Sequence, residues 1–172
     1  LKRNYQLHHV IVIPHYDASN RLVGIRGRQL NITNENIPKY MPIKIGDIIY
    51  SHPLSLNLYG LNISKDNIIN RRKVILFEGE KSCLKYDSFF DDNISVAVCG
   101  SNFNKYQLEL LFRICRPEEI IIAFDKEYTT PYCGDGEKYF NKLYDIGKKY
   151  EKYANFSFIY DKEDILEYKD SP

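Results

Sequence analysis

The sequence has no long apolar run. No stretch approaches the roughly 18 consecutive apolar residues that a membrane-spanning helix needs, and the first seven residues, L-K-R-N-Y-Q-L, lack the apolar core of a signal peptide. We therefore expect a cytoplasmic protein without a membrane partner. The chain begins at Leu1 rather than at a methionine and ends on D-S-P, so we expect it to be a piece of a longer protein.

The cysteines lack the spacing of a zinc site. Four cysteines occur, and no two of them form a C-x-x-C pair, which excludes the usual zinc ribbon. Cys83, Cys99 and Cys115 stand within apolar patterns, where a cysteine normally acts as a small buried side chain. We expect reduced, structural thiols and no zinc in this part of the protein.

The chain also lacks a strong excess of either charge, since its formal net charge is only +1. The two parts of the sequence differ, however. Residues 1–73 hold 11 Lys or Arg against four Asp or Glu, and residues 74–172 hold 13 against 19. A basic part that attracts phosphates joined to a part that concentrates carboxylates would show this pattern, and so would an unevenly charged, solvated surface. Charge alone does not decide between them.

The first part of the chain predicts a small β-rich subdomain. The segments H-H-V-I-V-I-P and R-L-V-G-I-R-G-R flank the turn residues 17–20, which is typical of a hairpin. Residues 32–59 contain three prolines, so we expect loops and single helical turns there. The pattern changes after the run Arg71-Arg72-Lys73. We place a domain boundary there, with an N-terminal subdomain over residues 1–73 and a second domain over residues 74–172.

The second part predicts an α/β fold, so that the whole chain is α+β. Four apolar runs alternate with three amphipathic or polar stretches. Apolar runs without alternation indicate strands covered on both faces, and helices between them indicate parallel pairing. We expect a parallel four-stranded sheet flanked by helices, with strands near residues 74–77, 94–99, 120–124 and 156–160.

Acidic residues follow these strands directly. Glu78 comes after the first run, and Asp125 and Glu127 come after the third. Ligands of open α/β sheets gather at the carboxyl ends of the strands, and two carboxylates two residues apart on an extended segment share a side. Oxygen ligands without histidine suit Mg²⁺ or Mn²⁺. The alternative is that these acids only complement the positive ends of helix dipoles.

Three segments in this order, V-I-L-F-E-G-E-K-S, V-A-V-C-G-S and I-I-I-A-F-D-K-E, resemble the Toprim domain of bacterial primases, topoisomerases and some nucleases. The resemblance implies that Glu78, Asp125 and Glu127 are the catalytic and metal-binding acids. Glu127 stands where the family has the second aspartate of its D-x-D pair, which puts the geometry of the metal site in doubt. The tail K-D-S-P resembles the position of a further acidic motif, which makes Asp170 a candidate metal ligand alongside the possibility that it is only a terminal acid.

The first part selects the primases among these families. The segments R-L-V-G-I-R-G-R-Q-L, P-K-Y and S-H-P-L-S-L-N-L-Y-G-L resemble primase motifs in the primase order. By this resemblance Arg28 and Lys39 match basic residues of the active-site face, and Arg26 is a further candidate. Pro53 stands where many primases have another lysine, so the match fails there.

The resemblance implies a phage-like or mobile-element-like DNA primase fragment that makes short RNA primers. Its expected partners are a single-stranded DNA template and NTPs, with a replicative helicase as a further partner of the family. Arg26, Arg28 and Lys39 would bind nucleic acid or NTPs, and Lys81 and Lys126, beside the acidic loops, are further candidates. Two alternatives stay open: a Toprim nuclease, and a non-catalytic module that binds single-stranded nucleic acid.

Overall fold

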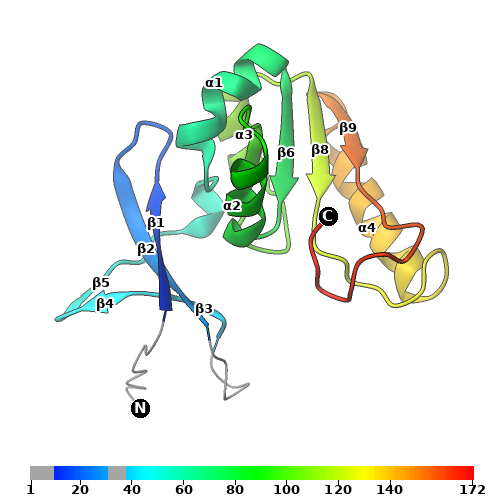
Figure 1. Cartoon of the computed structure of the whole chain (residues 1–172). Coiled ribbons are helices and arrows are strands. Elements are labelled where there is room, and N and C mark those ends of the chain that lie inside the picture. The colour runs from blue at the N-terminus through cyan, green and yellow to red at the C-terminus, as the bar shows by residue number, and fades with distance from the viewer. Residues whose placement is uncertain (1–9, 31–37) are drawn as a thin grey trace. The chain divides into compact units, whose positions relative to one another are not determined.

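The computed structural model describes residues 10–30 and 38–172, which divide into two compact units at Pro53 and Leu54 (Figure 1). Part of the segment that we expected to be irregular lies outside the described residues. The second unit begins well before the boundary that we placed at residue 73. The reason is that the segment before β6 buries its apolar side chains, Leu58 and Leu61 among them, with the α/β unit.

The first unit is an antiparallel β-structure. β1 (Val10–Tyr16), β2 (Leu22–Gln29) and β3 (Tyr40–Pro42) form one sheet in the order β1-β2-β3. This confirms the hairpin predicted around residues 17–20, where the Asp17 carboxylate accepts hydrogen bonds from the backbone N–H groups of Ser19 and Arg21. The prolines of the next segment do not prevent two further short strands, β4 (Lys44–Ile45) and β5 (Ile48–Ile49).

Gly24 in β2 is required by its neighbour. A Cβ atom at this position would lie 2.2 Å from Nδ1 of His52, which leaves no room for any other residue. His52 in turn packs against the buried ring of His15, with ring centroids 4.8 Å apart. His15 and His52 therefore pack against each other in the described part of this unit.

The second unit is the α/β domain that the sequence predicts. Its elements are η1 (Leu54–Leu56), α1 (Leu61–Arg71), β6 (Lys73–Phe77), α2 (Glu80–Phe89), β7 (Ser95–Ala97), α3 (Lys105–Ile114), β8 (Glu119–Ala123), α4 (Asp135–Tyr150) and β9 (Asn155–Phe158). The four strands pair in parallel in the order β7-β6-β8-β9. Helix α1 precedes β6, the first of these strands along the chain. The polar sequence of residues 64–73 did not indicate this helix.

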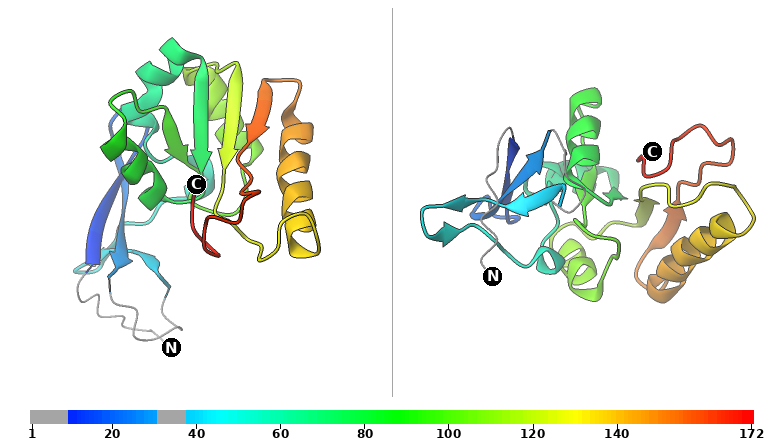
Figure 2. Two further views of the ribbon diagram at one scale, coloured as in Figure 1. Left: turned by 45° about the vertical axis from the view of Figure 1, so that its right-hand side comes forward. Right: turned by 90° about the horizontal axis from the view of Figure 1, so that it is seen from below.

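The order of the strands places helices on both faces of the sheet. The chain moves from β6 to β7 through α2, then reverses direction across the sheet through α3 and α4. Right-handed crossovers in opposite directions put their helices on opposite faces, and Figure 2 shows α2 on one side and α3 and α4 on the other. The core between these layers includes Leu76, Leu111, Ile122 and Leu143, none of which is exposed.

The described helices include none that is long and apolar enough to cross a membrane.

Candidate active site

The sheet brings two acidic segments to one edge. β6 and β8 are adjacent and pair in register, with Phe77 opposite Ala123 at their carboxyl ends. Glu78 follows Phe77 directly, and Asp125 follows Ala123 after one buried residue, Phe124. Because neighbouring parallel strands end side by side, the two carboxylates enter the same region.

Glu78 lies in an environment that disfavours its negative charge. The residue is half-buried, and its Oε2 atom is buried without a hydrogen-bond partner among the described residues. Burial first, and then the negative charges of Asp125 and Glu127, raise the pKa of Glu78 to about 6. A carboxylate that is desolvated and faces two like charges is stabilised by a bound cation. The oxygen-only donor set therefore fits a hard divalent ion.

Glu127 is held by two lysines. Nζ of Lys142, on α4, lies 2.7 Å from Oε2, and Nζ of Lys169, on the C-terminal segment, lies 3.3 Å from Oε1. These partners, Lys142 first, hold the pKa of Glu127 below its usual range. Among the described residues, Glu78, Asp125 and Glu127 do not form a cluster with all ligand atoms within 4.8 Å of one another. An ion that bound all three would require at least one of these side chains to move.

Sequence reasoning missed Lys142 and Lys169. Only the phase of α4 against β8 turns Lys142 to the site, and only the path of the C-terminal segment brings Lys169 there. The position of Lys169 directly before the candidate ligand Asp170 was the one available signal.

Lys126 does not have the role that we expected. Its side chain is only 3% exposed, and its Nζ donates to Asp161 at 3.0 Å, to Leu166 O at 2.7 Å and to Asp164. Alternate residues of an extended segment point to opposite sides, so Lys126 turns away from Asp125 and Glu127. The lysine anchors the C-terminal segment, and a phosphate contact does not fit this burial.

Asp170 lies beside the acidic segment through its backbone. The N–H of Lys126 donates to Asp170 O, and the N–H of Lys169 donates to Lys126 O, both at 2.8 Å. The Asp170 residue is exposed. This pairing brings the C-terminal segment next to Glu127, while metal binding by the Asp170 carboxylate stays a prediction.

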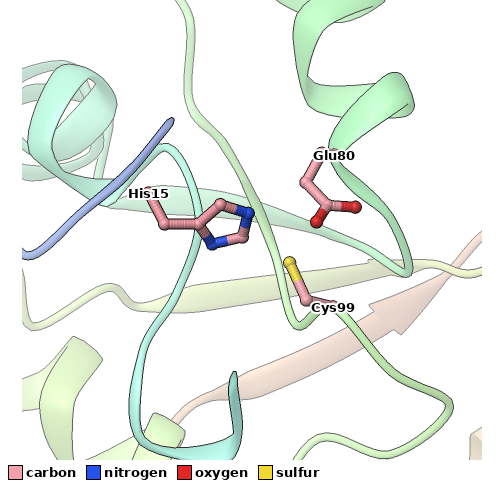
Figure 3. A group of neighbouring side chains, drawn as sticks. All are labelled: His15, Glu80 and Cys99. Carbon is pink, nitrogen blue, oxygen red and sulfur yellow. The ribbon is translucent and has the colours of Figure 1, made fainter. Parts of the chain in front are cut away.

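The start of α2 offers one exposed and one buried charge. Lys81 is exposed in the first turn of the helix, so it is free to reach a phosphate. Glu80 is buried and turns toward Cys99, the residue two positions beyond β7 (Figure 3). Their ligand atoms lie within 4.8 Å. Glu80 also contributes, after burial and Cys83, to raising the pKa of Tyr59 above its usual range.

Two of the four cysteines fit the expected structural role, whereas Cys99 is partly buried and Cys133 is exposed. Cys83 and Cys115 are buried, and all four cysteines are free thiols. Burial raises the pKa of Cys83 to about 12 and that of Cys115 to about 11. Thiols that ionise so reluctantly are poor nucleophiles at neutral pH.

The first unit carries the predicted basic residues. Arg26 and Arg28 lie on the same side of β2, and both guanidinium groups stack near the ring of Tyr40 on β3, at 5.0 and 5.9 Å from its centroid. Nε of Arg28 is buried without a hydrogen-bond partner among the described residues. Lys39 is exposed just before β3. This unit therefore presents a small basic and aromatic surface.

Comparison with known proteins shows what the chain is similar to. No family model matches. The chain is 40% identical over 173 residues to the SPbeta prophage-derived uncharacterized protein YorJ of Bacillus subtilis, covering 94% of this chain and 45% of that protein. It is 30% identical over 117 residues to the DNA primase of Campylobacter jejuni, covering 68% of this chain and 18% of the primase. The chain thus spans less than half the length of these relatives.

Solved structures show the same likeness at the level of fold. The zinc-binding and RNA polymerase domains of the Aquifex aeolicus primase match with a TM-score of 0.66 at 22% identity, over 93% of this chain and 36% of that chain. A DnaG primase catalytic domain bound to single-stranded DNA matches with a TM-score of 0.62 at 20% identity, over 95% and 47%. The chain therefore has the fold of the catalytic part of bacterial DNA primases, and the resemblance to these enzymes indicated by its sequence motifs is confirmed.

Proposed function

We propose that this chain is the catalytic fragment of a DNA primase, which joins ribonucleotides into short primers on a single-stranded DNA template. The observation that carries the proposal is the in-register ending of β6 and β8, which brings Glu78 beside Asp125 and Glu127 in a primase-like fold. Primer synthesis takes place on intracellular DNA, so a cytoplasmic location is part of the proposal.

The proposed site binds Mg²⁺ or Mn²⁺ through Glu78, Asp125 and Glu127, with Asp170 as a further ligand. Bound divalent ions would reduce the negative charge of the attacking 3′-oxygen and of the leaving pyrophosphate. The buried Oε2 of Glu78 and the raised pKa of this carboxyl support the assignment. The negative charge of these carboxylates would bind the divalent ions. Replacing any of the acids with its amide removes that charge at nearly the same size, so the activity should be abolished while the fold is preserved.

The proposed nucleic-acid contacts are Arg26, Arg28 and Lys39 for the template, with Lys81 beside the acidic site for an incoming NTP. Lysine and arginine bind phosphates without reading sequence, which suits an enzyme that accepts many templates. A DnaG catalytic domain of similar fold is bound to single-stranded DNA, which supports a nucleic-acid partner. A replicative helicase is a further partner proposed from the family likeness alone.

A primer-synthesis assay tests the proposal. The purified chain is incubated with single-stranded DNA, labelled NTPs and Mg²⁺ or Mn²⁺, and the products are separated on a denaturing gel. We expect short oligoribonucleotides that disappear with Asp125→Asn and persist with Glu163→Gln, an exposed acid distant in sequence. Cleavage of DNA with Mn²⁺ and no primers would instead indicate a Toprim nuclease. Metal-independent binding of single strands without any product would indicate a non-catalytic module.

A further inference from the structure

Two lysines from different parts of the second unit converge on one carboxylate. Lys142 contacts Oε2 of Glu127 and Lys169 contacts Oε1, so each oxygen has its own ammonium partner. Neither lysine was among the residues assigned to the site from the sequence. Their convergence on a proposed metal ligand, rather than on a surface acid, suggests a function.

The fold fixes the positions from which both lysines reach. On α4, Tyr139 donates its hydroxyl to Phe124 O at 3.1 Å, and Leu143 is fully buried. These two contacts place Lys142 against the end of β8. Lys169 is placed by its backbone hydrogen bond to Lys126. The fold therefore fixes the backbone positions of both lysines beside Glu127.

The ammonium groups themselves remain movable. The side chain of Lys142 is 30% exposed and that of Lys169 is 58% exposed, whereas that of Glu127 is 27% exposed. Lysine carries its charge on a flexible four-carbon stem and binds phosphate as a point charge. Each ammonium can therefore leave Glu127 and contact another anion nearby without any movement of the backbone.

A divalent ion on Glu127 would lie within a few ångströms of both ammonium groups, and the repulsion between these positive charges opposes binding them together. An ammonium that moves away from Glu127 when the ion binds would be left close to the site without its carboxylate partner. The triphosphate of an NTP, which divalent ions bind through its oxygens, would bring a compensating negative charge to this place.

We propose that Lys142 and Lys169 form a displaceable cation pair that occupies Glu127 before a divalent ion binds and that then binds the triphosphate of the incoming nucleotide. The inference rests on the proposed function, because it takes Glu127 as a metal ligand. It predicts two opposite effects on affinity. The lysines weaken the binding of the divalent ion, and they strengthen the binding of the nucleotide.

The first measurement is a titration of the whole chain with Mn²⁺. Electron paramagnetic resonance of the free ion monitors the binding. Lys142→Gln removes the competitor, so its Kd for Mn²⁺ should fall by about fivefold, the scale of a partly exposed ion pair. Lys142→Arg should raise the Kd, because a guanidinium binds a carboxylate bidentately and is harder to displace. Lys148→Gln, which breaks a pair with Glu151, the residue that follows the same helix, should change nothing.

The second measurement is ATP binding by calorimetry at saturating Mn²⁺. The Kd for ATP should rise by about threefold to tenfold in Lys142→Gln and in Lys169→Gln, with melting temperatures recorded to show that the variants fold. Mn²⁺ affinity that is unchanged or weaker in Lys142→Gln, or unchanged ATP affinity in both variants, overturns the inference while leaving the metal site intact. Absence of Mn²⁺ binding by the unaltered chain would instead overturn the proposed metal site, and the inference with it.

Discussion

Glu78 is the residue of the proposed site whose surroundings most clearly disfavour its own negative charge. Glu78 directly follows the apolar strand β6. Its Oε2 atom is buried without a hydrogen-bond partner among the described residues, and the negative charges of Asp125 and Glu127 help to raise its pKa. Such an arrangement costs free energy in the folded protein because the charged form is desolvated and repelled. Sites of this kind trade stability for function, which makes the cost itself measurable.

Glu78→Gln should stabilise the protein at neutral pH. The pKa of Glu78 is raised from 4.5 to about 6 in the folded protein, so the unfolded chain ionises first. As pH rises from 4.5 through 6, the folded state loses stability, and the loss is complete above 6. We expect the variant to gain about 1 kcal/mol over the unaltered protein at pH 8, after allowance for partial exposure, and to gain nothing at pH 4.

Urea denaturation at the two pH values measures this gain in free energy of unfolding. Glu163→Gln, at an exposed site, serves as the matched control and should behave as the unaltered protein does. Equal stability of Glu78→Gln and the unaltered protein at pH 8 would show that Glu78 is not under electrostatic strain.

Lys126 is a structural cation at the same scale. Replacing it with methionine keeps the length of the side chain but leaves Asp161 and Asp164 without their ammonium partner. Removing one member of a buried ion pair is strongly destabilising. We expect Lys126→Met to lower the melting temperature by about 5 °C or more in a thermal denaturation scan. A melting temperature equal to that of the unaltered protein would refute the anchoring role.

The sequence could predict part of the site at this scale. The strands β6 and β8 are predictable from their apolar runs, and ligands of such sheets bind at the carboxyl ends of the strands. The acids that follow these strands are Glu78, Asp125 and Glu127. Lys126 shows the limit of that reasoning, because a residue between two site acids turned out to face the interior. Lys142 and Lys169 depend on helix phase and on the path of an irregular segment, which local sequence does not encode.

The elements follow the same division. The strands of the parallel sheet were predictable because apolar side chains dominate the runs that form them, most clearly in β6 and β8, although β9 (Asn155–Phe158) at the edge of the sheet has no buried residue. Helix α1 was not, because its buried residues, Leu61, Ser64 and Ile68, form a stripe too narrow and too polar to stand out. Packing of these residues against the sheet stabilises the helix, and this tertiary contact cannot be recognised from the local sequence.

Helix α3 explains why residues from Leu54 onward join the second unit. The buried side chain of Gln107 donates to Asn57 O and Val98 O, both at 3.0 Å. The Asn104 side chain caps the helix and also donates to Ser55 O at 3.0 Å. These bonds attach the segment after Pro53 to the helix.

Gln107→Leu should lower the free energy of unfolding by about 2 kcal/mol, because two buried carbonyl groups lose this donor. Chemical denaturation measures the change, and Glu109→Gln at an exposed position of the same helix is the control. A loss below about 0.5 kcal/mol, typical of a surface substitution, would show that these bonds do not attach the segment.

The whole molecule consists of two units with opposite charge. Residues 1–53 hold seven Lys or Arg against three Asp or Glu, and residues 54–172 hold 17 against 20. The sequence shows the same difference in charge about the boundary that we placed at residue 73, whereas the compact units divide at Pro53 and Leu54. The second unit has its own core and sheet, so it has the means to fold alone.

A chain of residues 54–172 should therefore unfold cooperatively but bind single-stranded DNA about tenfold more weakly than the full chain at low salt. Its affinity should also depend less steeply on salt concentration, because fewer phosphate contacts release fewer counterions. Fluorescence anisotropy with a labelled oligonucleotide at several salt concentrations measures both quantities. Unchanged affinity and salt dependence would remove the first unit from the nucleic-acid interface.

The central claim is that the carboxyl ends of β6 and β8 form a divalent-metal site. Anomalous diffraction from crystals of the full chain grown with Mn²⁺ tests it most directly. The account predicts a peak within coordination distance of Glu78 and Asp125, with Glu127 turned from its lysines to join them. A strong peak elsewhere, with these carboxylates left unliganded at saturating Mn²⁺, would contradict it.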